Sequence, residues 1–246
     1  MNKMPIAIVT GAAKGIGKAI CKKLVNEGFY VVAVDMDKDG EAGLINELGK
    51  DNLEYVNMSI CIEQQVKELF TSVKNKFGTI SAVVNNAGII RDNMIWNMSA
   101  DDFDAVINVN LKGTWLMCRE AAMVMKEQKS GRIVNIASRA WLGNRGQSNY
   151  SASKAGVVAL TRVLALELGK YNVSVNAVAP GLIDTPLTQK LEKSVLQKLI
   201  DAQPSKSMGS PDDVANAVSF LVSGNTQFIT GQTIYVDGGK SIGANM

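Results

Sequence analysis

The stretch "IVTGAAKGIGKAI" (residues 8–20) places three glycines, Gly11, Gly15 and Gly17, between a short apolar run and a segment with helical periodicity. Glycine has no Cβ, so the backbone amides of such a turn can approach a phosphate closely, and the helix can pack tightly on the preceding strand. The amino end of that helix then faces the negative charge. Because the turn follows a strand and opens a helix, it predicts a dinucleotide-binding turn rather than an ordinary tight turn.

The same strand-to-helix pattern recurs along the chain. Apolar, β-branched runs lie at 6–9, 30–34, 53–57, 82–85, 132–137, 173–179 and 232–236. Their nearly continuous apolar character is typical of strands buried on both faces of a parallel sheet. Helical patterns occupy 15–27, 38–48, 61–77, 102–127, 150–170 and 211–223, with capping signals at Ser99 and at Ser210-Pro211. The alternation predicts an α/β fold: a Rossmann-type, doubly wound parallel sheet of about seven strands with helices on both faces.

No linker rich in glycine, serine or proline divides the chain, so we expect one dinucleotide-binding and catalytic domain over residues 1–246. One long excursion interrupts the alternation at 184–207, "DTPLTQKLEKSVLQKLIDAQPSKS". Excursions of this length are often lids over a site, and a plain surface excursion is the alternative.

Composition limits the classes of function. The net charge of +3 over 246 residues gives no argument for nucleic acid or a membrane surface as partner. No apolar run is long enough to span a bilayer, and no signal peptide is visible, which predicts a cytoplasmic protein. Cys21, Cys61 and Cys118 are widely spaced, as expected of reduced, packed thiols rather than of disulfides or metal ligands.

The chain contains no histidine. This excludes Ser–His–Asp and Cys–His catalysis and His-ligated zinc, so acid–base chemistry must come from Tyr, Lys or a carboxylate. The segment "NYSASKAG" (149–156) places Tyr150 and Lys154 four positions apart, on one face of a helix. An adjacent ammonium favours the anionic form of a phenol, whose pKa is ordinarily about 10. The pair is either an acid–base device or an ordinary polar helix start.

Two residues bear on the choice of dinucleotide. Asp35 closes the second strand, where a carboxylate accepts hydrogen bonds from the adenosine ribose of NAD and repels the 2′-phosphate of NADP. Lys14, within the glycine turn, has the opposite effect because its cation can hold that phosphate. We take Asp35 as the stronger determinant and expect NAD, with NADP through Lys14 as the lesser option.

Several motifs in the expected order resemble those of the short-chain dehydrogenase/reductase family, and the resemblance covers essentially the whole chain. They are "TGAAKGIG" (10–17), "NNAG" (85–88), "NVNLKG" (108–113), "IVNIAS" (133–138), "YSASK" (150–154), "PGLIDT" (180–185) and "VDGG" (236–239). The resemblance implies an NAD(P)-dependent enzyme that interconverts a ketone and a secondary alcohol by hydride transfer.

The resemblance also implies a role for four residues. Tyr150 is expected as the general acid/base, and Lys154 is expected to lower its pKa and to bind the nicotinamide ribose. Ser138 is expected to hydrogen-bond the substrate oxygen, and Asn110 to hold a water in a proton relay through Lys154.

The expected cofactor contacts follow the same motifs, and no metal site is expected. They are Gly11, Lys14, Gly15, Ile16, Gly17, Asp35, Asn86, Ala87, Gly88, Tyr150, Lys154, Pro180, Gly181, Ile183 and Thr185. The "NNAG" residues either contact the adenosine ribose or stabilise the central sheet. One departure concerns adenine, since Ser59, with Asn57 nearby, stands where many members carry an aspartate.

Within the family, residues 88–113 and 143–157 most resemble 3-oxoacyl thioester reductases, whose substrates are carried on acyl carrier protein or coenzyme A. Lys129 fits one carrier-docking position, whereas the other is Tyr171, with Lys170 beside it. The expected partner is therefore a small carbonyl or alcohol substrate, either an acyl thioester or a free ketone. The resemblance further suggests a homotetramer. Two alternatives stay open: a dehydrogenase of another secondary alcohol, and a non-catalytic dinucleotide-binding sensor.

Overall fold

The computed structural model describes residues 4–242, so the predicted domain limits at residues 1 and 246 lie outside the described part. Seven parallel strands form one sheet in the order β3-β2-β1-β4-β5-β6-β7. The strands are β1 (Ile6–Thr10), β2 (Tyr30–Asp35), β3 (Leu53–Asn57), β4 (Ala82–Asn85), β5 (Gly131–Ile136), β6 (Val173–Pro180) and β7 (Thr233–Val236). The helices are α1 (Gly15–Asn26), α2 (Gly40–Leu48), α3 (Glu63–Phe77), α4 (Ala100–Ile107), α5 (Thr114–Gln128), α6 (Ser148–Leu168), α7 (Lys193–Asp201) and α8 (Pro211–Val222). The predicted doubly wound α/β fold is confirmed.

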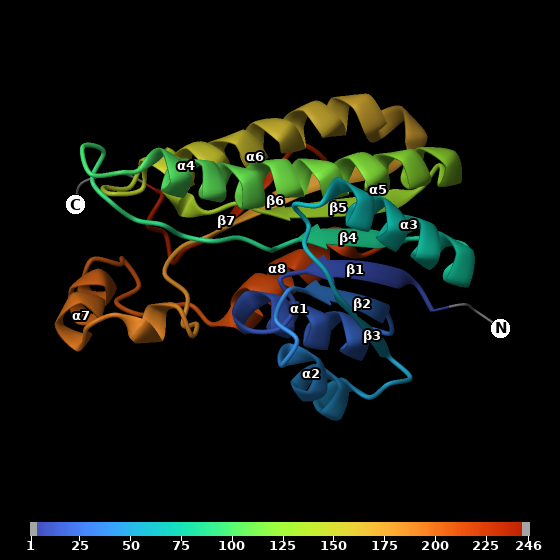
Figure 1. The fold of residues 1–246 in the computed structure, drawn as a ribbon, viewed down its shortest axis with the longest axis horizontal. Coiled ribbons are helices and arrows are strands. Elements are labelled where there is room, and N and C mark those ends of the chain that lie inside the picture. Colours follow the sequence, from blue (N-terminus) through green and yellow to red (C-terminus); the bar gives the residue numbers. More distant parts are fainter. Residues whose placement is uncertain (1–3, 243–246) are drawn as a thin grey trace.

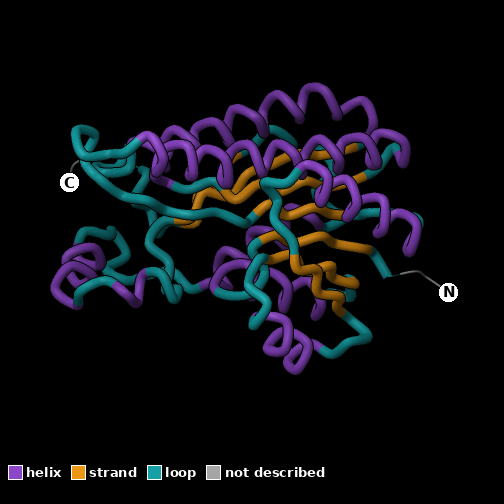
Figure 2. The backbone as a smooth tube through the Cα atoms, viewed as in Figure 1, coloured by secondary structure: helices purple, strands orange, loops and turns teal. Residues whose placement is uncertain are grey.

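Two layers of helices enclose the sheet (Figures 1 and 2). On one face, α3, α5 and α6 pack on strand residues such as Ile8 and Ile133. On the other, α1, α2 and α8 pack on the alternate strand residues, such as Val9 and Val134. Both faces of each central strand are therefore buried, which explains why these strands read as continuous apolar runs rather than alternating ones.

The predicted helix over 102–127 is divided by a change of pitch. Between α4 and α5, residues Asn108–Gly113 form a π-helical turn. Thr114 hydrogen-bonds back to the Asn110 carbonyl through its Oγ1, at 2.8 Å. Such turns insert one residue into the helical repeat and are frequent at functional sites. The sequence pattern does not show this turn, because its apolar spacing stays close to that of a plain helix.

Both predicted capping signals are present. The Ser210 side chain accepts from the Asp213 N–H, the Asp213 carboxylate accepts from the Ser210 N–H, and Pro211 opens α8. Ser99 Oγ likewise accepts from the Asp102 N–H at the start of α4. These contacts satisfy amides that lack a partner within their helices.

The segment predicted as a lid contains α7 and lies beside the carboxyl ends of the strands, at the left of Figure 1. No residue of α7 is buried. The two ends of the segment are joined, since the Asp184 N–H donates to the Gly209 carbonyl and the Gly209 N–H to the Leu182 carbonyl. The segment is thus a closed excursion on a fixed base.

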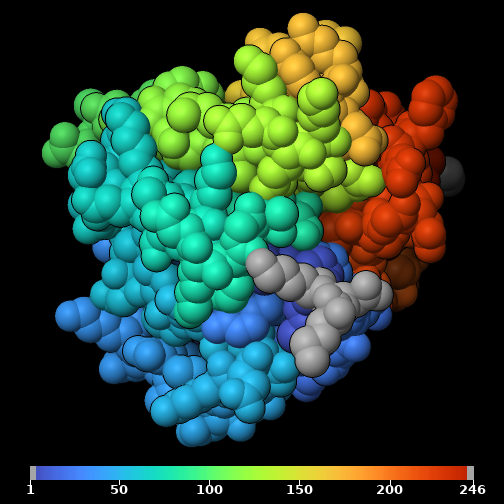
Figure 3. Space-filling model, turned by 90° about the vertical axis from the view of Figure 1, so that its right-hand side faces the viewer, coloured from blue at the N-terminus to red at the C-terminus, as the bar shows by residue number. Residues whose placement is uncertain are grey.

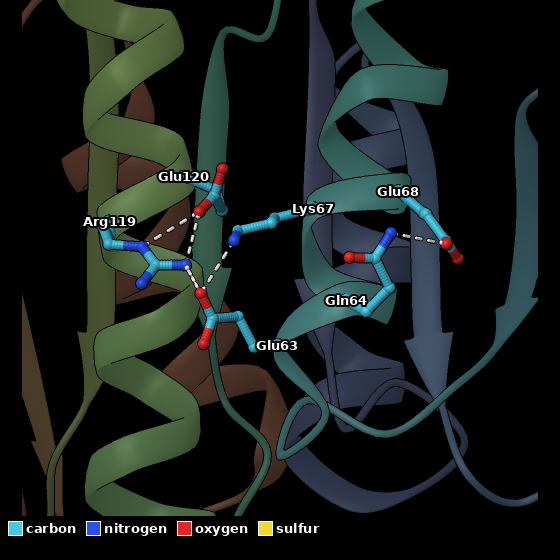
Figure 4. Close-up of polar contacts among 6 residues, drawn as sticks. All are labelled: Glu63, Gln64, Lys67, Glu68, Arg119 and Glu120. Atoms are coloured by element: carbon cyan, nitrogen blue, oxygen red, sulfur yellow. Dashed lines mark hydrogen bonds and ion pairs between the residues drawn. The ribbon is translucent and has the colours of Figure 1, made fainter.

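Helices α3 and α5 are further connected by ion pairs on their outer surfaces (Figure 4). Arg119 contacts Glu63 at 2.9 Å and Glu120 at 2.8 Å, and Lys67 also reaches Glu63 at 2.9 Å. Glu63 and Lys67 are about half exposed, so water screens these pairs, and apolar packing supplies the main cohesion of the two helices.

Residues 4–242 contain neither a membrane-spanning helix nor a cluster of metal ligands. None of the helices in this part of the chain is long and apolar enough to cross a membrane. Nor do three or more acidic, cysteine or histidine side chains gather there in an arrangement that could bind a metal ion. Cys21, Cys61 and Cys118 are free thiols.

Candidate active site

The predicted site residues come from loops at the carboxyl ends of the strands and from the first turns of α6. In open parallel sheets this edge holds the ligand, at the point where the strand order reverses. Here the order reverses between β1 and β4, which are neighbours in the sheet although β2 and β3 come between them in the chain. The glycine turn follows β1, and "NNAG" follows β4.

The glycine turn has a backbone that other residues would strain. Gly11 and Gly15 have φ of +65° and +56°, in the left-handed region. A Cβ on Gly17 would lie 1.9 Å from the Gly11 carbonyl oxygen, so only glycine permits this approach of α1 to the turn. No side chain caps the first amides of α1, and its first turn has no acidic residue. These free amides suit an anionic group, as the pyrophosphate of a dinucleotide requires.

Asn86, expected either to contact the adenosine ribose or to stabilise the central sheet, braces the glycine turn. Its side-chain nitrogen donates to the carbonyls of Thr10 and Gly11, at 3.0 Å each. Thr10 Oγ1 in turn accepts from the amides of Asn86 and Ala87, at 3.0 and 3.1 Å. The alternative expectation, that "NNAG" stabilises the fold, thus has direct contacts in the structure. Ile16 packs its side chain on the core from the first turn of α1, which leaves its backbone for a ligand.

Carboxylates surround the end of β2. Asp35 accepts from the Ala13 N–H at 2.9 Å and from the Asp37 N–H at 3.0 Å. It therefore links the glycine turn to the loop after β2 and retains further lone pairs for a ligand hydroxyl. Lys14 Nζ lies 3.2 Å from Asp37 Oδ2, so its cation is already paired with a carboxylate.

Asn57 and Ser59 are the residues that the sequence places near the expected adenine position. Asn57 donates from Nδ2 to the Asp35 carbonyl at 3.1 Å. The Ser59 hydroxyl accepts from the Cys61 N–H at 3.3 Å and so helps to shape the start of α3. Both side chains thus have local structural partners.

Ser138 follows the end of β5 and lies beside Tyr150, in the first turn of α6. The Ser138 hydroxyl accepts from the Ala140 N–H at 3.1 Å, which fixes its orientation. Burial raises the pKa of Tyr150 above its ordinary value. The hydrogen bond with Ser138 lowers this pKa in part, and the nearby Asp92 carboxylate raises it. The protein's own groups therefore keep the phenol protonated at neutral pH, so the pKa shift has the opposite direction to the one expected from Lys154.

Lys154 is a buried amine, 3% exposed. Its Nζ donates to the Ile136 carbonyl at 2.8 Å and lies 5.7 Å from the centre of the Tyr150 ring. Burial lowers the pKa of Lys154 to about 8. The lysine ammonium therefore lies over the tyrosine ring, as the i,i+4 spacing predicts.

Asn110 lies in the π-helical turn and is fully buried. Its side chain accepts from the Ile89 N–H at 2.8 Å and donates to the Ile89 carbonyl at 3.0 Å and to Ser153 Oγ at 3.2 Å. A Cβ on Gly88 would lie 3.2 Å from Asn110 Oδ1 and 3.6 Å from Lys154 Nζ. Gly88, Asn110 and Lys154 thus border the same space.

The residues after β6 form the base of the lid segment. Gly181 packs so closely on Asp237 that a Cβ would lie 2.7 Å from its side chain, while Pro180 ends the strand. Ile183 is buried. Thr185 lies across from the glycine turn, since a Cβ on Gly15 would be 3.7 Å from its Cγ2. The glycine turn and the lid base therefore face each other, as a groove for a dinucleotide requires.

Two long-range hydrogen bonds beside Tyr150 were not predicted from the sequence. Gln147 donates to Asp92 Oδ2 at 2.8 Å, and Asn149 donates to the Arg91 carbonyl at 2.8 Å. These bonds tie the loop after β4 to the start of α6. Burial raises the pKa of Asp92, the residue that acts electrostatically on Tyr150. The partners are about 55 positions apart, so no local spacing reveals them.

Fold, glycine turn and tyrosine–lysine pocket together define a dinucleotide-dependent oxidoreductase. A family model described as "Enoyl-(Acyl carrier protein) reductase" matches residues 11–241. The chain belongs to the short-chain dehydrogenase/reductase family, and it is an oxidoreductase of the ketone–alcohol pair that uses a nicotinamide dinucleotide. Because the chain is assigned as an oxidoreductase, the non-catalytic dinucleotide-binding sensor is no longer an alternative.

The chain is also similar to individual relatives and to solved structures. The chain is 42% identical to a 3-oxoacyl-acyl-carrier-protein reductase, FabG, of Thermotoga maritima, over 96% of this chain and 98% of the relative. It is 41% identical to BbsD of Thauera aromatica, a subunit of a hydroxy(phenyl)methylsuccinyl-CoA dehydrogenase, over 96% of both. Among solved structures, levodione reductase superposes with a TM-score of 0.93 at 32% identity, covering 98% of each chain. ElxO with NADP bound superposes with a TM-score of 0.92 at 30% identity, covering 96% of this chain and 98% of ElxO.

Proposed function

We propose that this chain is an NAD(H)-dependent oxidoreductase that interconverts 3-oxoacyl and 3-hydroxyacyl thioesters. The observation that carries the chemistry is the half-buried Tyr150 phenol, whose pKa is lowered by a hydrogen bond with Ser138 and whose ring lies under the Lys154 ammonium. The thioester rests on two relatives: one is named for an acyl-carrier-protein substrate and the other for a CoA substrate.

The proposed mechanism needs one proton and one hydride. When bound, a reduced nicotinamide supplies the hydride to the carbonyl carbon. Tyr150 gives its phenolic proton to the carbonyl oxygen, and Ser138 hydrogen-bonds that oxygen and holds it in line. Because burial keeps the pKa of Tyr150 above neutrality, the phenol carries the proton that this role requires. In the reverse direction the same phenol, once deprotonated, accepts the proton of the alcohol.

Lys154 and Asn110 would support the acid–base role of Tyr150. With its pKa at about 8, Lys154 exchanges protons readily near neutrality and can return a proton to the phenolate. Asn110 fixes the loop after β4 through both the N–H and the carbonyl of Ile89. This bond pattern positions Gly88 beside Lys154, where the nicotinamide ribose would lie. The proposed cofactor contacts are those named from the sequence, with Asn86 acting by bracing the turn.

The preference for NAD rests on the charges at the end of β2. A 2′-phosphate placed there would meet the Asp35 carboxylate, and the nearest cation, Lys14, is already paired with Asp37. Two like charges at about 4 Å repel by about 1 kcal/mol in water and by more in a partly desolvated site. ElxO, at 30% identity, has NADP bound, so the preference is a property of these residues rather than of the fold.

Coenzyme A is the simpler carrier for this chain. Lys129 and Lys170 lie beyond the carboxyl ends of α5 and α6, and the Tyr171 ring lies 5.2 Å from Lys170 Nζ and 5.5 Å from Lys126 Nζ. This end of the molecule faces the viewer in Figure 3, where the ends of α5 (yellow-green) and α6 (gold) adjoin at the top. Tyr150 lies at the opposite end of α6, about 30 Å away for a helix of 21 residues. A carrier protein docked on these lysines would therefore not reach Tyr150 of the same copy.

The test is oxidation of NADH and of NADPH, side by side, with acetoacetyl-CoA as acceptor, for the wild type and for Asp35→Ala. We expect turnover with NADH to exceed that with NADPH, and Asp35→Ala to improve NADPH use relative to NADH. Wild-type preference for NADPH would refute the Asp35 argument alone. Absence of turnover with either would refute the thioester, and free ketones such as cyclic diketones are then the next substrates to assay.

A further inference from the structure

A chain of buried polar side chains runs beneath the proposed site, on the α5–α6 face of the sheet. Asn135, fully buried near the carboxyl end of β5, donates from Nδ2 to Thr161 Oγ1 of α6 at 2.9 Å. Its Oδ1 accepts from Asn85 Nδ2 of β4 at 2.8 Å and from Cys118 Sγ of α5 at 3.4 Å. Thr161 Oγ1 in turn donates to the Val157 carbonyl at 2.8 Å. One amide thus connects two strands and two helices.

Placing such a group in an apolar core costs free energy unless its bonds are complete. Apolar residues replacing all members of such a network can be nearly neutral for stability, so the network calls for a reason besides the fold. The position of the amide in the chain suggests another reason. The next residue on β5 is Ile136, whose carbonyl accepts from Lys154 Nζ. Two residues beyond Ile136 lies Ser138, the partner of Tyr150.

Helix α6 is therefore joined to β5 by two adjacent hydrogen bonds. One runs from Lys154 to Ile136, and the other from Asn135 to Thr161. Lys154 and Thr161 are seven positions apart, which is two helical turns, so both face the sheet. The remaining contacts there are apolar, with Val157 and Val158 packed on small residues such as Ala137. Apolar contacts are not directional, and they restrain sliding of the helix along its axis less than hydrogen bonds do.

We propose that Asn135 and Thr161 are positioning residues for the reaction: their hydrogen bond fixes the axial position of α6 on β5, and thereby aligns Tyr150 with Ser138 and Lys154 with Ile136. This inference rests on the proposed roles of Tyr150 and Lys154. A displacement of about 1 Å at reacting groups can cost about 100-fold in rate. A small slide of α6 would therefore be visible in turnover well before the fold is lost.

The experiment compares Thr161→Val, which keeps the shape of the side chain but removes the acceptor of Asn135, with Thr161→Ser, which restores a hydroxyl. The matched control is Asn176→Leu. Asn176 is 1% exposed on the neighbouring strand β6, and its bonds go to Ile229 and Gln232 rather than to α6. Three quantities are measured: the melting temperature, kcat with acetoacetyl-CoA at saturating NADH, and the pKa of Tyr150. The pKa of Tyr150 is obtained by ultraviolet titration of phenolate. The titration curve of the same variant with Tyr150→Phe added is subtracted, so that only the Tyr150 signal remains.

We expect Thr161→Val to lower kcat at least about tenfold at a temperature where every variant is folded, and Thr161→Ser to recover most of it. The pKa of Tyr150 should rise further in Thr161→Val, since the hydrogen bond with Ser138 that lowers it is weakened. Asn176→Leu should lower the melting temperature without moving that pKa. The proposal is overturned if Thr161→Val and Asn176→Leu change kcat and the pKa of Tyr150 alike, or if Thr161→Val changes neither.

The titration needs no substrate, which separates this inference from the proposed function. If the wild type does not reduce acetoacetyl-CoA, that failure counts against the thioester alone. The shift of the Tyr150 titration in Thr161→Val, or its absence, then decides whether the Asn135–Thr161 bond positions the phenol.

Discussion

Gly17 offers the sharpest test of the glycine turn. In Gly17→Ala the new Cβ would lie 1.9 Å from the Gly11 carbonyl oxygen and 2.6 Å from Asn86 Nδ2. Real Cβ contacts essentially never fall below 3.0 Å, so the turn and α1 must separate by about 1 Å. Neither neighbour can yield easily, because Gly11 is main chain and Asn86 is fixed by bonds to the Thr10 and Gly11 carbonyls.

Two consequences follow from this separation. Overpacking of this kind costs about 1–3 kcal/mol of the free energy of unfolding. The effect on dinucleotide binding should exceed the effect on stability, because the amides that would hold the pyrophosphate move by about 1 Å. We expect NADH affinity to fall by about 100-fold. The measurements are a thermal melt and a titration of NADH fluorescence.

Gly43→Ala is the matched control. Gly43 lies inside α2, and a Cβ there would meet nothing within 4 Å. Alanine at that position should raise stability by about 0.5–1 kcal/mol and leave NADH affinity unchanged. Unchanged NADH affinity in Gly17→Ala, with the protein folded, would refute the argument that this turn holds the pyrophosphate.

Two further predictions concern the acid–base pair. Tyr150→Phe should lower turnover by about 100- to 10,000-fold, while NADH affinity stays within about twofold. Steady-state rates and fluorescence titration measure the two quantities. Parallel loss of both would mean that the phenol maintains the structure of the site rather than transferring a proton. The rates should also depend on pH differently in the two directions. Because burial raises the pKa of Tyr150, the proton-donating form persists through neutrality, so ketone reduction should be flat from about pH 6 to 8, whereas alcohol oxidation, which needs the phenolate, should climb with pH. Oxidation that falls as pH rises over this range would contradict the assignment.

The strands of the sheet could be predicted because burial on both faces requires a recognisable amino-acid composition. Val31 to Val34, Ile133 and Val134 lie between two helical layers, and such strands need mainly apolar, β-branched residues on both faces. The Ser210 cap could be predicted for a local reason as well, since Ser210, Pro211 and Asp213 complete the motif within four positions.

The site could be predicted less completely, because much of it depends on main-chain groups and distant pairs. The Ile136 carbonyl, which accepts from Lys154, has no side-chain signature. Asp92 and Gln147 meet only once the loop after β4 folds over the start of α6. The π-helical turn at Asn110 keeps an ordinary helical composition. The expectation that Lys154 would lower the pKa of Tyr150 did not include burial, which acts in the opposite direction.

The absence of histidine has a physical consequence for this site. A histidine-based site uses a group whose ordinary pKa of about 6.5 lies near neutrality. This chain must instead work with a phenol and an amine whose ordinary pKa values are both about 10 or above. Burial separates the two: it lowers the pKa of Lys154 to about 8 and raises that of Tyr150. Near neutrality Tyr150 therefore carries its proton, and a phenolate left after donation can be reprotonated from Lys154, which exchanges protons more readily. The burial that separates these pKa values depends on α6 packing closely on β5, so the alignment of that helix is as much a part of the acid–base chemistry as the two side chains.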